Sequence, residues 1–266
     1  MGRIEDCFSL LRAHGKKAFV AYITAGDPSL KSTIQLVHEF ESQGVDIVEL
    51  GIPFSDPIAD GPVNQEAAMR ALKNNVSLDQ IFEMVRDIRK KSEIPLVFFA
   101  YLNTIFAYGF EKFVSDAGDA GVDGVLILDL PPEEATDYKK HMDAKGIATI
   151  FLVSPITPDN RLDIIVKYAS GFVYYVSQMG VTGERSHIAE DIPMMTEAIR
   201  ARTTVPIVVG FGISTPDQVR KIACYADGVV VGSSIVRRIG ESYNQPGFET
   251  GIALYVGTLT APLQGE

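Results

Sequence analysis

Short apolar runs alternate along the chain with longer stretches in which apolar residues recur at helical spacing. There are eight such runs. They show little of the polar alternation expected of strands with one solvated face, as is typical of parallel strands buried on both faces. The runs are Ala18–Thr24, Ile47–Gly51, Pro95–Ala100, Gly124–Leu128, Ala148–Val153, Phe172–Val176, Pro206–Val209 and Gly228–Val231.

The stretches between the runs carry the pattern of amphipathic helices. Pro216 follows Ser214 and Thr215, a sequence favoured at the start of a helix. The predicted helices are Lys31–Ser42, Leu78–Lys90, Phe110–Ala120, Glu133–Lys145, Asn160–Tyr168, Ile188–Ala201 and Pro216–Ala223.

Eight strand–helix units in 266 residues predict an α/β protein, a single (β/α)8 TIM barrel. No linker or shift in composition divides the chain, so residues 1–266 are expected to form one domain. A doubly wound open sheet is the alternative. Met1–His14 reads as an extra N-terminal helix that closes the barrel floor.

Glycine-rich segments follow the last three runs, at residues 180–183, 210–214 and 232–234. Glycine lets backbone amides approach an anion closely, and a helix start behind it adds a positive dipole end. Phosphate sites of barrels lie beside the last strands. This position favours the barrel over the open sheet and predicts one phosphate held between neighbouring strand ends.

Composition narrows the class of protein. A net charge of −10 and a pI near 4.9 argue against a nucleic-acid or acidic-lipid surface. Cys7 and Cys224 make neither a disulfide framework nor a zinc site. We find no signal-peptide pattern and no run of membrane-spanning length, so a cytoplasmic protein is expected.

Acidic residues within and after the second apolar run are candidates for chemistry. Glu49 lies inside an apolar run, where an ionised side chain is costly. Burial would raise its pKa and suit it to acid–base catalysis, although a structural carboxylate remains the alternative. The following loop, Ile52–Pro62, carries Asp56 and Asp60. It reads as a lid or a partner contact, or simply as a loop capped by aspartates.

Other chemistries find little support. A Schiff-base enzyme needs a lysine at a strand end, and none of the eight runs contains one. The four histidines have no paired spacing, so no metal is predicted. Aromatic and large apolar residues near strand ends form either ordinary core or a flat pocket for an aromatic ligand. They are Phe19, Tyr22, Phe99, Tyr101, Leu126, Phe151, Tyr174 and Phe211.

The chain resembles the α subunit of tryptophan synthase along nearly its whole length. Residues 49–62, ELGIPFSDPIADGP, are the most specific part of the resemblance. The matching segments are Tyr22–Pro28, Glu49–Pro57, Asp60–Pro62, Tyr101–Asn103, Asp129–Pro131, Ser177, Gly180–Gly183, Gly210–Ser214 and Gly232–Ser233.

The resemblance implies a lyase that cleaves indole-3-glycerol phosphate to indole and glyceraldehyde 3-phosphate in tryptophan biosynthesis. It places the catalytic glutamate at Glu49 and the catalytic aspartate at Asp60. Tyr22 stands where the family often has phenylalanine against the indole ring. The implied substrate-binding residues are Tyr174, Thr182, Gly183, Phe211, Gly212, Gly232, Ser233 and Ser234.

The family works as an α2β2 heterotetramer in which indole passes to the β subunit. Pyridoxal phosphate is expected only in that partner, and no cofactor in this chain. Pro53–Asp60 and Asn103–Gly109 would face the partner. The location would be the cytoplasm, or the plastid stroma in a plant or alga. Another phosphate-binding barrel enzyme, and a catalytically weak subunit that mainly activates its β partner, are the alternatives.

Overall fold

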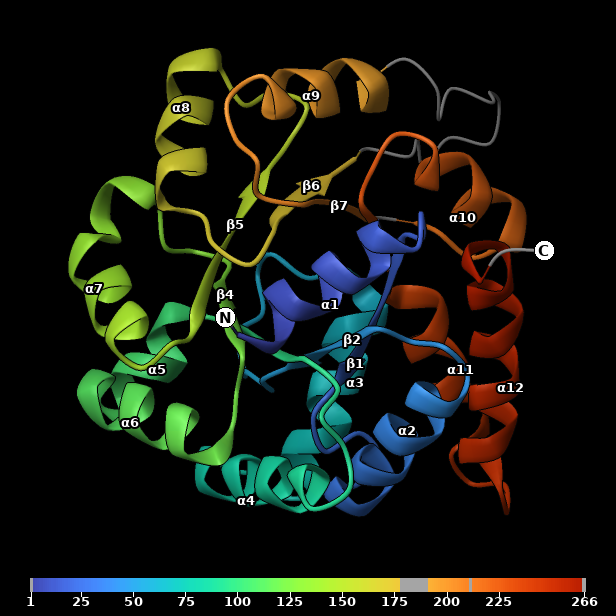
Figure 1. The fold of residues 1–266 in the computed structure, drawn as a ribbon. Helices are drawn as coiled ribbons and strands as arrows, with labels where there is room; N and C mark the ends of the chain where they lie inside the picture. Colours follow the sequence, from blue (N-terminus) through green and yellow to red (C-terminus); the bar gives the residue numbers. More distant parts are fainter. Residues whose placement is uncertain (1, 178–190, 211, 265–266) are drawn as a thin grey trace.

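The protein is described here by a computed structural model covering residues 2–177, 191–210 and 212–264. Eight parallel strands in these ranges close into a barrel in chain order, with helices around the outside (Figure 1). The predicted (β/α)8 architecture is confirmed. The strands are β1 Ala18–Thr24, β2 Ile47–Gly51, β3 Leu96–Ala100, β4 Gly124–Ile127, β5 Ala148–Val153, β6 Val173–Val176, β7 Ile207–Gly210 and β8 Gly228–Val231.

The helices include several that periodicity did not predict, among them α3, α5, α11 and α12. They are α1 Arg3–Ala13, α2 Leu30–Ser42, α3 Pro62–Lys73, α4 Leu78–Arg89, α5 Leu102–Tyr108, α6 Phe110–Ala120, α7 Thr136–Ala144, α8 Asp159–Tyr168, α9 Asp191–Arg200, α10 Pro216–Ala223, α11 Ser233–Ser242 and α12 Phe248–Thr260. Short 3-10 helices span Pro132–Glu134 and Ala261–Leu263. The predicted start of α10 is confirmed, with Thr215 as its N-cap and Pro216 as its first residue.

Successive residues of each strand face opposite sides of the barrel wall. On β1, Phe19 and Ile23 pack outward in the larger core cluster, between the barrel and the helices. Val20 and Tyr22 pack in the smaller cluster, inside the barrel. Both clusters are apolar, so neither face of the strand needs polar residues.

Helix α1 closes the floor of the barrel, as the sequence predicted. Ile4 and Phe8 of α1 belong to the inner cluster. The Phe8 ring lies 6.1 Å from that of Phe172, measured between centroids. Figure 1 shows α1 lying over the centre of the ring of strands.

The C-terminal helix packs against an early helix in the outer layer. Helix α12 packs against α2, and the Thr260 hydroxyl donates a hydrogen bond to the Gln43 carbonyl at 2.5 Å. These contacts support our proposal that residues 1–266 form one domain.

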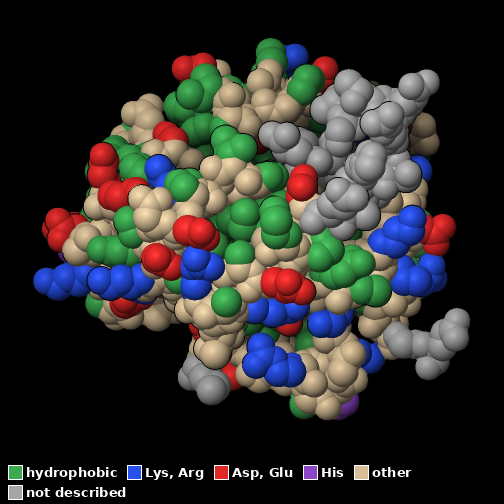
Figure 2. Space-filling model, turned by 90° about the horizontal axis from the view of Figure 1, so that it is seen from above, with side chains coloured by type: hydrophobic (Ala, Val, Ile, Leu, Met, Phe, Trp, Pro, Cys, Tyr) green, Lys and Arg blue, Asp and Glu red, His purple; other side chains and the backbone are tan. Residues whose placement is uncertain are grey.

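No described helix combines the length and apolar character needed to span a membrane. The face seen in Figure 2 carries basic and acidic side chains interspersed.

A buried ion pair ties the floor together. The Asp123 carboxylate, just before β4, accepts hydrogen bonds from Arg89 of α4 at 2.6 Å and Arg3 of α1 at 3.0 Å. It also accepts one from the Leu96 amide at 2.8 Å. Both Asp123 and Arg89 are almost fully buried, so neither charge can be rehydrated if its partner is removed.

Asp123→Ala is therefore expected to lower the free energy of unfolding by about 3 kcal/mol, because it leaves a buried guanidinium without its counter-charge. Asp87→Ala is the control, since the Asp87–Lys90 pair is exposed and contributes little to stability. Urea unfolding followed by circular dichroism measures both. Equal losses for the two variants would contradict the prediction.

Candidate active site

Glu49 projects into the barrel from the middle of β2. It is the register neighbour of Tyr22 on β1 and of Val97 on β3. The residue is 0% exposed, and neither carboxyl oxygen has a hydrogen-bond partner among the described residues. Burial raises the pKa of Glu49 to about 8, so the side chain is mostly neutral at pH 7.

Asp60 is held at the end of the loop between β2 and α3. Its carboxylate accepts a hydrogen bond of 2.9 Å from the Tyr101 hydroxyl, which itself accepts one from the Ala59 amide at 3.0 Å. The Phe54 ring packs on the Tyr101 ring, with centroids 5.1 Å apart. Burial raises the pKa of Asp60, opposed by the hydrogen bonds from Tyr101 and Asn64.

Tyr101 is a residue whose role the sequence did not reveal. It was predicted only as a pocket aromatic, and it proves to hold Asp60. Its place directly after β3 is a signal, because side chains at strand ends form the sites of barrels. Its pairing with a residue 41 positions earlier has no local signature.

Three glycines give two tyrosines room in the mouth of the barrel. A side chain at Gly210 would come within 2.6 Å of the Tyr174 hydroxyl, and one at Gly51 would overlap the Tyr22 hydroxyl. At Gly232 an added Cβ would lie 3.2 Å from the Tyr22 Cβ. These glycines therefore allow large aromatic side chains to fill the space beside Glu49.

The ends of β7 and β8 supply backbone donors for an anion. Gly232 is the N-cap of α11, so the amides of Ser233 and Ser234 lie in its first turn and have no intrahelical acceptor. The Ser234 hydroxyl donates to the Ile213 carbonyl at 3.1 Å and joins the two strand ends. Gly212 has a φ of +69°, a backbone conformation that favours glycine.

The predicted binding residues separate into two groups. Tyr174, Gly212, Gly232, Ser233 and Ser234 lie within the described residues, at or next to the carboxyl ends of β6, β7 and β8. Thr182, Gly183 and Phe211 lie outside the described residues, as does the segment 180–187.

The aromatic and large apolar residues near the strand ends divide between the two alternatives, pocket and ordinary core. Phe99, Leu126 and Tyr174 belong to the inner cluster. Phe19 and Phe151 instead face the helices in the outer cluster and are ordinary core. Successive side chains of a strand point to opposite faces, and a run without polar alternation does not show which residues point inward.

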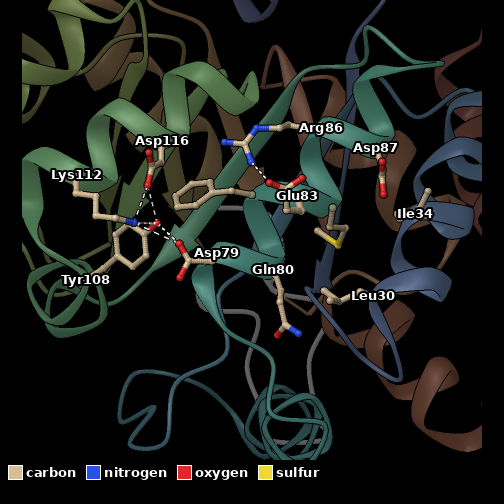
Figure 3. Close-up of a pocket in the computed structure, with 12 residues that line it drawn as sticks. Leu30, Ile34, Asp79, Gln80, Glu83, Arg86, Asp87, Tyr108, Lys112 and Asp116 are labelled. Atoms are coloured by element: carbon tan, nitrogen blue, oxygen red, sulfur yellow. Dashed lines mark hydrogen bonds and ion pairs between the residues drawn. The ribbon is translucent and has the colours of Figure 1, made fainter.

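Two hollows lie away from Glu49. One, of about 590 Å³, is lined by the ends of β4 and β5 and includes Leu128 and Ile156. The other, of about 550 Å³, lies on the outer wall between α2, α4, α5 and α6 (Figure 3). There the Lys112 amine pairs with Asp116 at 2.9 Å. Neither hollow is lined by Glu49, Asp60 or a predicted substrate-binding residue, so the positions of the strand ends, and not these cavities, locate the site.

The described residues contain no group of three or more His, Cys, Asp or Glu side chains placed to hold a metal ion.

Comparison with known proteins identifies the family of the chain. The model of the family described as tryptophan synthase alpha chain matches residues 8–254. The chain belongs to the tryptophan synthase alpha chain family.

Relatives cover nearly all of the chain. A tryptophan synthase alpha chain from Geotalea daltonii is 48% identical over 261 residues, 98% of each chain. Among solved structures, the subunit alpha from Legionella pneumophila superposes with a TM-score of 0.90 at 37% identity, covering 99% of each chain.

A further match is a chain in the solved structure of the tryptophan synthase a2b2 complex from Pyrococcus furiosus. It superposes with a TM-score of 0.85 at 38% identity, over 92% of this chain and 99% of that one. The segment that matches the family model includes all the predicted site residues, from Glu49 to Ser234.

Proposed function

We propose that Glu49 and Asp60 are the catalytic residues of this chain. As a tryptophan synthase alpha chain, it is a lyase that cleaves indole-3-glycerol phosphate to indole and glyceraldehyde 3-phosphate. The observation that carries the assignment of residues is Glu49 itself. This buried carboxyl has no hydrogen-bond partner among the described residues, and its register partner Tyr22 lies against Gly232, the N-cap of α11.

Glu49 has the protonation state that the first step needs. Its raised pKa keeps it protonated, so it can donate a proton to indole C3. The resulting carboxylate then accepts the proton of the glycerol hydroxyl next to C3. The bond between C3 and that carbon breaks, an aldehyde forms, and the electron pair restores the indole ring. The glutamate gives one proton and receives one.

Asp60 acts on the other side of the indole. Protonation at C3 leaves positive charge on the ring nitrogen, and a carboxylate beside the N–H stabilises that charge. The Tyr101 hydroxyl favours the ionised form of Asp60 by donating to it. The two acidic residues therefore have different environments: among the described residues, none donates a hydrogen bond to Glu49, whereas Tyr101 and Asn64 donate to Asp60.

The backbone at the ends of β7 and β8 would hold the phosphate. Gly212, Gly232, Ser233 and Ser234 supply amides there, and the dipole of α11 adds positive potential. Tyr174 and the apolar inner cluster would contact the indole ring. Thr182, Gly183 and Phe211 complete the proposed binding set from outside the described residues.

The chain works with a tryptophan synthase β subunit, in an α2β2 heterotetramer. We propose that indole passes to that subunit and that the pyridoxal phosphate is bound there. Two large apolar side chains are exposed in the segments predicted to face the partner: Ile58 is 80% and Phe106 61% exposed. The cytoplasm, or a plastid stroma, stays the predicted location.

Glu49→Gln should reduce indole release from indole-3-glycerol phosphate by about 10²- to 10⁴-fold, the usual contribution of an acid–base group. Indole is measured with and without a β subunit, and circular dichroism checks the fold. Glu66→Gln, an exposed change on α3, is the matched control and should keep full activity. Equal turnover by Glu49→Gln and wild type would refute the assignment.

The pH dependence should follow the protonated form of Glu49. Because kcat/KM reports the free enzyme, it should fall as pH rises through about 8, where Glu49 loses its proton. Steady-state rates measured between pH 6 and about 10 test this expectation. A kcat/KM that still rises above pH 9 would mean that the ionised form of Glu49, not the acid, starts the reaction.

Gly212→Val tests the phosphate site. A β-branched residue is strained at a φ of +69°, so the amides of this turn should be displaced. Loss of one or two charge-assisted hydrogen bonds should raise KM by about 10- to 100-fold. Gly146→Val is the control, since Gly146 has the same φ of +69° in the turn before β5. An unchanged KM in Gly212→Val places the anion elsewhere.

A further inference from the structure

Tyr22 brings a hydroxyl group into the mouth from the strand next to Glu49. The two residues are direct register partners, and both occupy inward-facing positions. The Tyr22 ring meets the Phe99 ring edge-on, with centroids 5.2 Å apart, and its base lies against Gly232. Its hydroxyl lies over Gly51, two residues after Glu49 on the same face of β2.

The polar groups around this hydroxyl have unmade hydrogen bonds. Glu49 and Thr24 are 0% and 3% exposed, and no described residue bonds to either carboxyl oxygen or to the Thr24 hydroxyl. Thr24 follows Tyr22 by two residues and shares its face of β1. Buried polar groups are normally hydrogen-bonded, so a donor near the Glu49 carboxyl would meet an acceptor that has bonds to spare.

The chemistry indicates when a donor is needed. Once Glu49 has given its proton to the substrate, an ionised carboxylate stands in the buried interior of the barrel, which is costly without a hydrogen-bond donor. Burial and the nearby Asp60 and Glu49 charges raise the pKa of Tyr22 further above its ordinary value. The phenol therefore stays protonated and can act only as a neutral hydrogen-bonding group.

We propose that Tyr22 is a positioning residue whose hydroxyl donates a hydrogen bond to the ionised Glu49 carboxylate, holding it in place to receive the second proton. The proposal rests on the proposed function of Glu49. It concerns only the hydroxyl group, because a phenylalanine would make the same ring contacts with Phe99 and Gly232.

Tyr22→Phe removes the hydroxyl and keeps the ring, so it should lower kcat by about 3- to 10-fold, the effect of one hydrogen bond. KM should stay within about twofold, because the phosphate amides are untouched. Loss of the donor disfavours the ionised form of Glu49, so the alkaline limb of kcat should move to higher pH. A residue that only fills space would leave this limb where it is.

The matched control is Tyr175→Phe. Tyr175 is also buried, and its hydroxyl also lacks a partner among the described residues, but it faces the outer helices. Its kcat and pH profile should equal those of wild type. A change of similar size in both variants would assign the effect to packing and overturn the proposal.

A second measurement is independent of turnover. Infrared titration follows the protonated carboxyl band of Glu49, identified as the band absent from Glu49→Gln, in the presence of glycerol 3-phosphate. Its midpoint should be higher in Tyr22→Phe than in wild type. An unchanged midpoint together with an unchanged kcat overturns the proposal, and so does a change in KM alone.

These outcomes are separable from failure of the proposed function. If Glu49→Gln is inactive while Tyr22→Phe equals wild type in every measurement, the proposed role of Tyr22 is refuted and that of Glu49 is not. If wild type releases no indole, the catalytic assignment falls, and the infrared midpoints still decide whether the two side chains are bonded.

Discussion

The site depends on one unfavourable placement, an acidic side chain inside a barrel that makes no hydrogen bond to any described residue. Glu49 is tolerated because it can stay neutral, and burial makes neutrality its ordinary state near pH 7. The apolar inner cluster maintains this environment from below, with Ile4 and Phe8 of α1 closing the floor against water. Replacing that packing by solvent would return Glu49 to an ordinary surface carboxylate.

Stability and chemistry occupy opposite ends of the same strands. At the floor, Asp123 satisfies Arg89, Arg3 and the Leu96 amide, so a buried charge is fully bonded. At the mouth, Glu49 and Thr24 have bonds left unmade among the described residues. Such groups are expensive in a folded protein. The fully hydrogen-bonded network at the floor stabilises the fold, and the fold in turn holds the groups with unmade hydrogen bonds at the mouth in position.

The sequence predicted most of the scaffold, because parallel strands and helices have distinct apolar patterns. All eight strands are confirmed, with ends that shift by no more than one residue, as for β3 and β7. Glu49 was visible because a carboxylate inside an apolar run is conspicuous. The side of the barrel wall on which Phe19 and Phe151 lie could not be predicted, because fully buried strands lack an alternation of polar and apolar residues. The Tyr101–Asp60 bond was not visible either, because it joins distant residues that only the closed barrel brings together.

Unmade hydrogen bonds alone do not mark a site, and other buried hydroxyls show why. Tyr138 and Tyr175 also lack partners among the described residues, yet both belong to the outer cluster, between barrel and helices. Glu49 and Thr24 differ in facing the mouth, where α11 begins with free amides and Tyr22 presents its hydroxyl over Gly51. A ligand at the mouth can satisfy these groups, whereas none can reach the outer pair without parting the helices. Position relative to the barrel axis therefore separates the proposed catalytic group from hydroxyls that are merely buried.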